Sequence, residues 1–329
     1  MNRPSVVGAG SWGTAIALVL ARRGLSVRLW VHNADLAERM LKTRLNDAYL
    51  PGFPLCESIE ICTNLHNCVQ GADAVTFAVP SHALRQVAGS ARGGLSRDAV
   101  LISATKGLEE ATLLRMSQVL RESCGSEKIV VLSGPSFARE VAQEQPTAIV
   151  AACADLGLAL AVQNLFSAAR FRVYASQDVM GVELGGAVKN VIAIAAGVCH
   201  GLHLGQNAIA ALITRGLAEM CRLAAAMGAQ PQTLAGLAGL GDLVLTCTGE
   251  LSRNRQVGIH LAQGQTLQQI LQGMKTVAEG IKTTGSVVEL GRRKQVDLPI
   301  SEQMYSVLHG RRSAPDAIGI LMERSPREE

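Results

Sequence analysis

The segment SVVGAGSWGT, residues 5–14, decides the fold of this chain. A short apolar strand ends at Val7, a G-x-G-x-x-G turn follows, and an apolar helix begins near Thr14. In such a turn Gly8 permits a tight bend, Gly10 lets the backbone approach a pyrophosphate, and Gly13 lets helix and strand pack closely. The N-terminus of the helix then offers N–H groups to phosphate oxygens. The context predicts a dinucleotide-binding unit; the alternative is a βα turn with a purely structural role.

The rest of the first half alternates strand and helix patterns. Further apolar strand candidates are 27–31, 74–79, 100–104, 129–132, 147–151 and 171–174, with helical segments such as 112–123 and 158–167 between most of them. Strands that alternate with helices predict parallel βαβ units and a Rossmann-type, doubly wound parallel sheet.

After residue 177 the strand patterns fade and helical periodicity dominates. Helices are predicted at 207–229, 253–262, 266–273, 283–294 and 301–309. On the first of these, Arg215 and Glu219 form a predicted i,i+4 pair, and Glu219 and Arg222 a predicted i,i+3 pair. We therefore expect an α/β domain over residues 1–177 and an all-helical domain over residues 178–329.

Composition narrows the possible partners. The 329 residues carry 31 Lys and Arg against 27 Asp and Glu, a net charge of +4, and only 3% are aromatic. No basic stripe or nucleic-acid-binding motif is present, so we expect no nucleic-acid partner. The longest stretch without Asp, Glu, Lys or Arg, residues 190–214, has polar residues at its centre. It is interpreted as two buried helices joined by a Gly-His loop, so no stable membrane insertion is expected.

The eight cysteines form no Cys-x-x-Cys pair. In a chain of this length without an export signal they are interpreted as reduced thiols, which predicts a cytoplasmic protein. Cys62, His66 and Cys68 fit no standard zinc spacing, so no metal site is expected.

The end of the second strand bears on cofactor choice. Dinucleotide folds that prefer NAD usually place Asp or Glu there, about 20 residues beyond the loop, to bind the ribose hydroxyls. Here the strand ends Trp30-Val31-His32-Asn33, without an acid, and Asp35 follows two residues later. His32, with Arg28 or Asn33 nearby, could receive a 2′-phosphate, which predicts that NADP(H) is accepted. The alternative is that His32 is only a surface side chain.

Two lysines stand out in apolar surroundings. Lys106 directly follows a strand, at the edge where such sheets bind ligands; the alternative is an ordinary surface lysine. Lys189 is almost alone in a long apolar helix, and its helical neighbours Gly185, Gly186 and Ala193 are small, which would leave an open cleft around it. A lone charge in such a segment must meet a partner, a ligand or water.

Lys189 is thus a candidate general acid and base. The alternative is a structural ion pair with a buried acid such as Glu183 or Asp242. Further along, Asp242 lies in a glycine-rich segment, Ser252 is a predicted helix N-cap, and Arg253 offers bidentate phosphate recognition. Together with the two lysines these residues would suit a small phosphorylated substrate.

The chain closely resembles the bacterial-type NAD(P)-dependent glycerol-3-phosphate dehydrogenases over nearly its whole length. The matching segments are residues 7–15 (VGAGSWGTA), 79–82 (VPSH), 104–109 (ATKGLE), 133–138 (SGPSFA), 184–191 (LGGAVKNV), 238–243 (AGLGDL) and 252–255 (SRNR). Their order and spacing are more specific than any one of them. Departures are mild: Trp12 stands where Tyr or Phe is common, and Ser136 where Thr is frequent.

The resemblance implies the reversible reaction of sn-glycerol 3-phosphate and NAD(P)⁺ to dihydroxyacetone phosphate and NAD(P)H, which supplies phospholipid synthesis. It also implies a helical domain of the 6-phosphogluconate-dehydrogenase-like type and a homodimer. The catalytic residues it implies are Lys189, the proton acceptor and donor, with Lys106 and Asp242. The implied cofactor contacts are Gly8, Gly10, Ser11, Trp12, Gly13, His32, Lys106, Ala138, Arg253, Val277 and Glu279. The implied substrate contacts are Lys106, Gly134, Ser136, Lys189, Asp242, Ser252, Arg253 and Asn254.

Two other functions remain as alternatives. A related 3-hydroxyacid dehydrogenase would use the same fold on a carboxylate, but in that family the Lys and Asn stand about one helical turn apart, whereas Lys189 and Asn190 are adjacent. A cofactor-sensing protein without turnover would have no need for Lys106, Lys189 and Asp242 together.

Overall fold

The computed structural model describes residues 1–274 and 278–325, and it divides into two compact units. Unit 1 comprises Met1–Lys106 and Leu114–Glu183, and unit 2 comprises Gly107–Leu113 with the chain from Leu184 onward. The division at Glu183 falls inside helix α8 (Val179–Gly201), shortly after the expected boundary at 177/178. No sequence signal assigned the segment Gly107–Leu113 to the second unit.

Unit 1 is built on an eight-stranded sheet in the order β10-β9-β8-β7-β6-β1-β2-β5. Its strands are β1 (Pro4–Val7), β2 (Val27–Trp30), β5 (Ile59–Cys62), β6 (Ala74–Phe77), β7 (Val100–Ser103), β8 (Ile129–Ser133), β9 (Thr147–Ala152) and β10 (Phe171–Ser176). A separate hairpin pairs β3 (Leu45–Asn46) with β4 (Leu50–Pro54). The predicted strands are all present, whereas β3, β4 and β5 were not predicted.

One pairing departs from the predicted parallel sheet. Strands β1, β2, β5, β6, β7 and β8 are parallel to one another. Strand β9 is antiparallel to β8, and β10 is parallel to β9. Between β8 and β9 the chain forms only the five-residue helix α6 (Ala138–Ala142), so it turns back instead of making a full crossover.

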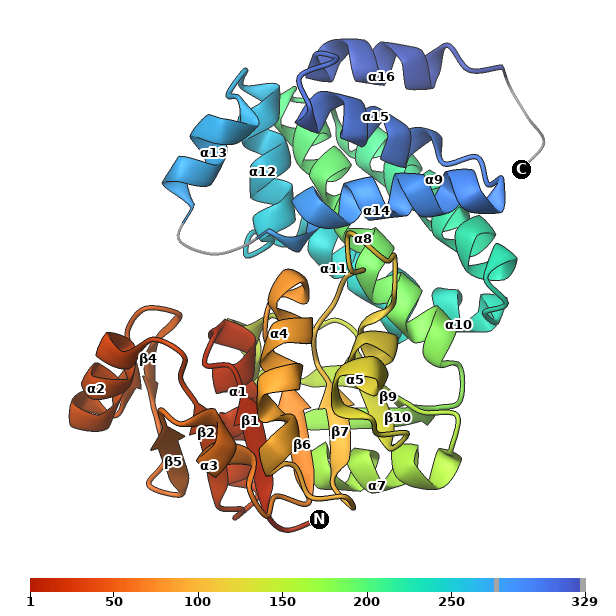
Figure 1. Cartoon of the computed structure of the whole chain (residues 1–329). Helices are drawn as coiled ribbons and strands as arrows, with labels where there is room; N and C mark the ends of the chain where they lie inside the picture. Colours follow the sequence, from red (N-terminus) through yellow and green to blue (C-terminus); the bar gives the residue numbers. More distant parts are fainter. Residues whose placement is uncertain (275–277, 326–329) are drawn as a thin grey trace. The chain divides into compact units, whose positions relative to one another are not determined.

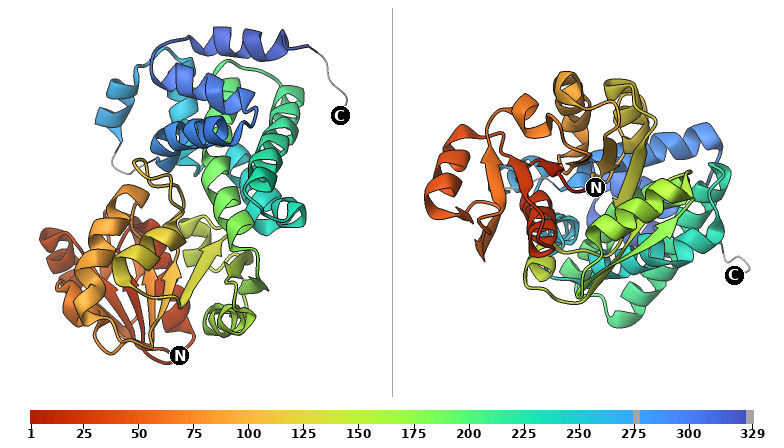
Figure 2. Two further views of the ribbon diagram at one scale, coloured as in Figure 1. Left: turned by 45° about the vertical axis from the view of Figure 1, so that its right-hand side comes forward. Right: turned by 90° about the horizontal axis from the view of Figure 1, so that it is seen from below.

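Helices cover both faces of the sheet, as the layers in Figures 1 and 2 show. One face carries α3 (Leu65–Val69), α4 (Ser81–Ala91), the short 3₁₀ turn Arg92–Gly94 and α5 (Met116–Cys124); the other carries α1 (Ser11–Arg22), α6 and α7 (Leu156–Phe166), with α2 (Ala34–Thr43) near β5. Side chains alternate between the two layers along each strand, because successive residues point to opposite faces. Val6 thus lies in one buried cluster and Val7 in the other.

Unit 2 is helical in its described part. Its elements are most of α8, then α9 (Gln206–Ala226), α10 (Pro231–Ala235), the π-helical turn η2 (Leu237–Gly241), α11 (Asp242–Thr248), α12 (Arg253–Ala262), α13 (Leu267–Gly273), α14 (Glu279–Lys294), α15 (Pro299–Leu308) and α16 (Ala314–Met322). The two helices predicted within 190–214 are present as α8 and α9, and the predicted helix 253–262 is α12. Helix α8 is buried as predicted, but the predicted burial of the second helix is wrong, because residues 206–214 of α9 are largely exposed. Residues 112–115 are not helical, since α5 begins only at Met116.

Glycines let the other helices approach α8 at backbone distance. A Cβ built on Gly197 would lie 2.0 Å from the Arg255 carbonyl oxygen, and one on Gly258 would lie 1.9 Å from the Ile194 carbonyl oxygen. Both positions therefore require glycine, and α8 and α12 pack directly against each other. Helix α8 is also long and apolar enough to cross a membrane, but its apolar window is entirely buried within the protein.

The predicted pair of Arg215 and Glu219 is wrong, whereas the charge of Arg222 acts on Glu219 and lowers its pKa. Glu219 is buried and accepts hydrogen bonds from the backbone N–H of Ile300 (2.5 Å) and Ser301 (3.2 Å) and from the Ser301 hydroxyl (3.0 Å). Its carboxylate thereby caps the N-terminus of α15. Burial raises the pKa of Glu219 to about 7, although these hydrogen bonds act to lower it.

Candidate functional site

The glycine-rich turn of unit 1 lies where the strand order reverses. Strand β1 has β2 on one side and β6 on the other, which is the position at which such sheets bind ligands. Gly8 has φ +113°, and a Cβ there would lie 2.7 Å from the Ala78 carbonyl oxygen; one on Gly13 would lie 1.8 Å from the Gly8 carbonyl oxygen. A Cβ on Gly10 would meet no atom within 4 Å. Gly8 and Gly13 thus serve packing, while Gly10 leaves space beside the loop.

The N-terminus of α1 offers donors to that space. The helix has no side-chain cap, and the Thr14 N–H is bonded within the turn to the Gly10 carbonyl (3.0 Å). The N–H groups before it belong to the first turn, which lacks intrahelical partners and suits an anion. The indole Nε1 of Trp12 is buried and has no partner among the described residues. These features fit the pyrophosphate of a dinucleotide.

His32 is exposed at the end of β2. Its ring lies 5.4 Å from that of Trp30, centroid to centroid. Asn33 instead caps α2 by accepting from the Leu36 N–H (2.7 Å), and Arg28 donates to the Asn67 carbonyl (2.7 Å). Of the three residues suggested for a 2′-phosphate, Arg28 and Asn33 therefore make hydrogen bonds within the protein, whereas the exposed His32 is the better candidate.

Lys106 and the segment after β8 form a second cluster at the same edge of the sheet. The Gly134 carbonyl accepts from Lys106 Nζ and from the Ser136 hydroxyl, both at 2.9 Å. Gly134 has φ +130°, and a Cβ there would lie 3.0 Å from the Cα of Ile149. Only glycine is compatible with this backbone. Ala138 begins α6, directly after these residues.

In unit 2 the polar residues of the candidate site surround Lys189. This residue of α8 is buried, with only 6% of its surface exposed. Its ammonium donates to the Asp242 carboxylate at 2.6 Å and to the Thr246 hydroxyl at 2.8 Å. Thr246 in turn donates to the backbone carbonyl of Asp242 (2.6 Å). Of the two acids suggested as partners, Asp242 is the one found, because Glu183 instead binds Arg115 and Ser117.

Asp242 reaches α8 through an unusual turn. The π-helical residues Leu237–Gly241 precede it, and such turns are frequent at functional sites. A Cβ on Gly185 would lie 2.4 Å from the Ala238 carbonyl oxygen, so this glycine lets the turn pack on α8. The space that the sequence suggested as an open cleft beside Lys189 is thus occupied there by the chain itself.

The segment Ser252–Asn254 begins α12. Ser252 is its N-cap, as predicted, and accepts from the Arg255 N–H (3.2 Å). Asn254 is buried; its amide donates to the Asn190 side chain (2.9 Å), and its oxygen accepts from the Gly280 N–H (2.9 Å). This network ties α12 to α8 and to the start of α14.

Arg253 is exposed, yet enough protein surrounds its guanidinium to lower its pKa by desolvation, an effect that the Glu279 carboxylate opposes. Glu279 is the first residue of α14. Val277, also expected to contact the cofactor, lies outside the described residues.

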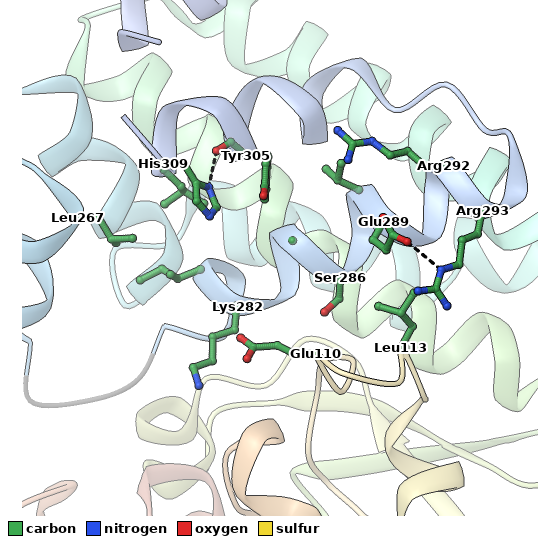
Figure 3. A pocket seen from close by; sticks show the side chains of 14 residues that line it. Glu110, Leu113, Leu267, Lys282, Ser286, Glu289, Arg292, Arg293, Tyr305 and His309 are labelled. Atoms are coloured by element: carbon green, nitrogen blue, oxygen red, sulfur yellow. Dashed lines mark hydrogen bonds and ion pairs between the residues drawn. The ribbon is translucent and has the colours of Figure 1, made fainter. Parts of the chain in front are cut away.

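A separate pocket of about 450 Å³ lies in unit 2 (Figure 3). Its walls come from the segment Gly107–Leu113 and from α13, α14 and α15, and no described residue of the predicted site lines it. Figure 3 shows Lys282 and Arg292 pointing away from one another, and Arg293 is paired with Glu289 (2.9 Å). Among the described residues no group of three or more His, Cys, Asp or Glu could hold a metal.

The structure thus gathers the predicted residues into two groups. In unit 1 the turn Gly8–Gly13, His32, Lys106 and Gly134–Ala138 all follow the carboxyl ends of parallel strands. In unit 2 Lys189, Asp242, Ser252 and Asn254 come from α8, α11 and α12. Thr246 had no predicted role, although its position one helical turn after Asp242 was a usable signal.

A dinucleotide turn at the reversal of a parallel sheet, followed by a helical unit with a buried lysine–carboxylate pair, defines a dinucleotide-dependent dehydrogenase. Comparison with known proteins narrows the class. Models of the N-terminus and the C-terminus of NAD-dependent glycerol-3-phosphate dehydrogenase match residues 4–159 and 178–319. The chain belongs to this family.

Relatives match over the whole length. The glycerol-3-phosphate dehydrogenase [NAD(P)+] of Syntrophotalea carbinolica is 51% identical over 98% of this chain and 98% of that protein. The enzyme of the same name from Geobacter sulfurreducens is also 51% identical, over 100% of this chain and 99% of that protein. The solved structure of the Coxiella burnetii glycerol-3-phosphate dehydrogenase superposes with a TM-score of 0.94 at 39% identity, covering 98% of this chain and 99% of that one. The predicted fold class, enzyme class and NAD(P) cofactors are confirmed.

Proposed function

We propose that this protein reduces dihydroxyacetone phosphate to sn-glycerol 3-phosphate with NAD(P)H, reversibly, and so supplies phospholipid synthesis. Family membership and relatives at 51% identity support the reaction. The observation that carries the mechanism is the buried Lys189–Asp242–Thr246 group, because a positioned ammonium is what ketone reduction needs.

Unit 1 provides the residues for the cofactor. The N-terminus of α1 and the space beside Gly10 suit the pyrophosphate, and Ser11, Trp12 and Ala138 lie in the loop or at the sheet edge. His32 would hold the 2′-phosphate of the ribose. When bound, the dinucleotide supplies the hydride. The lack of an acid at the end of β2 supports use of both NADPH and NADH.

Unit 2 provides the proton. Lys189 donates a proton from Nζ to the alkoxide oxygen as the carbonyl is reduced, and in the oxidative direction the neutral amine accepts it. Asp242 and Thr246 accept hydrogen bonds from Lys189 Nζ and so hold the ammonium in place. Because all three residues are buried, the position of Nζ is fixed by the fold.

The remaining residues are assigned to the substrate, including its phosphate, and to the cofactor. We assign Ser252, Arg253 and Asn254 to the phosphorylated substrate, since a helix N-terminus with an arginine suits an anion. Lys106, Gly134 and Ser136 are assigned to the substrate from unit 1, and Val277 and Glu279 to the cofactor. These roles rest on the resemblance, with Arg253 serving both ligands.

Purified protein tests the proposal directly. We expect loss of NADPH absorbance with dihydroxyacetone phosphate, and far slower loss with a 3-hydroxyacid precursor such as a 3-oxo carboxylate. Turnover only of the carboxylate would identify a hydroxyacid dehydrogenase. NADPH binding with no turnover of either would identify a cofactor-sensing protein.

We further propose a cytoplasmic homodimer. The eight cysteines are all free thiols, which supports a reducing compartment, and the family resemblance supports the dimer. Sedimentation equilibrium of the purified chain at two concentrations tests the dimer, because a single species at the 34.6 kDa of one chain would contradict it.

A further inference from the structure

Asn46 is a completely buried polar residue outside every motif of the sequence. It lies in the small hairpin of β3 and β4, which does not pair with the main sheet. Burying an amide is unfavourable unless its hydrogen bonds are replaced within the protein. The partners of this side chain therefore indicate what the position requires.

All three partners connect the hairpin to the dinucleotide turn or to the hairpin itself. Nδ2 of Asn46 donates to the Ala9 carbonyl and to the Thr14 hydroxyl, both at 2.8 Å. Oδ1 accepts from the Tyr49 N–H (3.1 Å). The carbonyl acceptor on one side and the N–H donor on the other allow only one orientation of the amide.

A second contact holds the same turn from the other side. The Ser11 hydroxyl donates to the Tyr49 carbonyl at 2.6 Å. Ala9 and Ser11 flank Gly10, so the hairpin grips the turn on both sides of the residue that leaves space for a pyrophosphate. Because three of the six residues from Gly8 to Gly13 are glycine, the turn has little conformational preference of its own.

We propose that Asn46 is a positioning residue for the cofactor: its amide fixes the dinucleotide turn in the conformation that binds the pyrophosphate. The inference rests on the proposed function only in assigning the turn to NAD(P). The pyrophosphate is common to NADPH and NADH, so loss of Asn46 weakens both equally. A residue at the adenosine ribose, such as His32, would change their ratio instead.

The test compares Asn46→Ala and Asn46→Asp with the unaltered chain by titrating NADPH and NADH fluorescence. We expect both dissociation constants to rise by at least ~10-fold, equivalent to about 1.4 kcal/mol, with the NADPH to NADH ratio unchanged. Asn46→Asp should be the more damaging, because its carboxylate would face the Ala9 carbonyl. Hydrogen exchange without nucleotide should become faster in the peptide that covers residues 8–14.

Two further variants make the result decisive. Arg39→Met removes the exposed ion pair with Asp47 on the same hairpin (3.0 Å) and should change neither measurement. Should both Asn46 variants fail to fold, Thr14→Val removes one acceptor alone and should raise both constants in the same proportion. Unchanged constants and exchange in a folded variant would overturn the inference, as would a wild-type chain that binds neither nucleotide. Wild-type binding without ketone turnover would overturn only the proposed function.

Discussion

The two units use different parts of the polypeptide in their candidate sites: unit 1 uses the backbone and unit 2 a side chain. In unit 1 the groups proposed to face the ligand are backbone N–H donors at a turn, and glycine at position 10 leaves open space beside it. In unit 2 the group proposed to react is a buried side chain, and glycines such as Gly258 pack against the backbone of a neighbouring helix. Glycine therefore leaves space for a ligand in one unit and allows close packing of two helices in the other.

This difference teaches how each unit should respond to substitution. Changes at the turn of unit 1 should affect binding of the cofactor while the fold persists. Changes in unit 2 should affect either the chemical step or the stability of the helical core. Each prediction below tests that separation.

The largest effect is expected at Lys189. Lys189→Met should lower kcat by at least ~10²-fold, because it removes the proposed general acid, and should change NADPH affinity little. It also leaves the Asp242 carboxylate buried without its cation, at a cost of about 3–5 kcal/mol. The double variant with Asp242→Asn should recover stability without recovering kcat. Near-normal turnover in Lys189→Met would assign the acid to another group, with Lys106 the next candidate.

Arg253→Ala should weaken the transition state for dihydroxyacetone phosphate by about 2–5 kcal/mol, as for loss of a charged partner. Dihydroxyacetone, which lacks the phosphate, should lose much less. The measurement is kcat/KM for both substrates at saturating NADPH. Equal losses would instead assign Arg253 to the cofactor or to the fold.

The glycines offer a matched pair. Gly258→Ala should destabilise the protein by about 3 kcal/mol, because the new methyl group would overlap the Ile194 carbonyl of α8. Gly10→Ala should change stability by less than about 1 kcal/mol, yet raise the dissociation constant of NADPH by ~10-fold or more. Urea unfolding and nucleotide titration of both variants check this. Similar stability losses in the two would remove the distinction between the units.

Glu219 predicts how stability depends on pH. Its pKa is about 7 in the folded protein, above its ordinary value, so the folded state holds the proton more tightly than the unfolded state. This contribution is fully present below the unfolded pKa and is lost as pH rises toward 7, by about 2 kcal/mol between pH 5 and 7. Urea unfolding of the wild type and of Glu219→Gln should diverge by that amount. Parallel pH profiles would mean that Glu219 stays ionised in the core.

The smallest effect concerns the choice of cofactor. NADPH should be used at least as well as NADH, and His32→Asp should shift the ratio of kcat/KM values toward NADH by ~10-fold, or about 1.4 kcal/mol. The added carboxylate would repel a 2′-phosphate and accept from a ribose hydroxyl. A wild-type preference for NADH above ~10-fold would contradict the assignment of His32.

Local signals predicted much of the fold. The turn Gly8–Gly13, the strands of the main sheet and the cap at Ser252 each follow from spacing over a few residues. The hairpin was missed because β3 has only two residues and β4 contains two prolines. The antiparallel direction of β9 was missed because strand direction depends on how the chain returns.

Partners distant in sequence were harder to predict. Lys189 had Glu183 and Asp242 as equal candidates, since helical periodicity places neither against it, and only tertiary packing chose Asp242. Glu219 was misplaced for the same reason: its spacing to Arg215 suits an exposed helix, whereas its burial is set by the start of α15. Asn46 has no local signal, because its partners lie far away in the chain.

Segment Gly107–Leu113 has a consequence for synthesis and engineering of the chain. These residues belong to the helical unit although they are encoded within the sheet unit, and Leu108 among them is buried. A gene fragment beginning at residue 178 or 184 would lack them and expose the apolar surface that they cover. During synthesis the ribosome also releases this segment long before the helices that it packs against. The core of the helical unit can therefore form only when the later helices meet the earlier segment. Separate expression of the helical half therefore requires residues 107–113 to be supplied, for instance through a circular permutation.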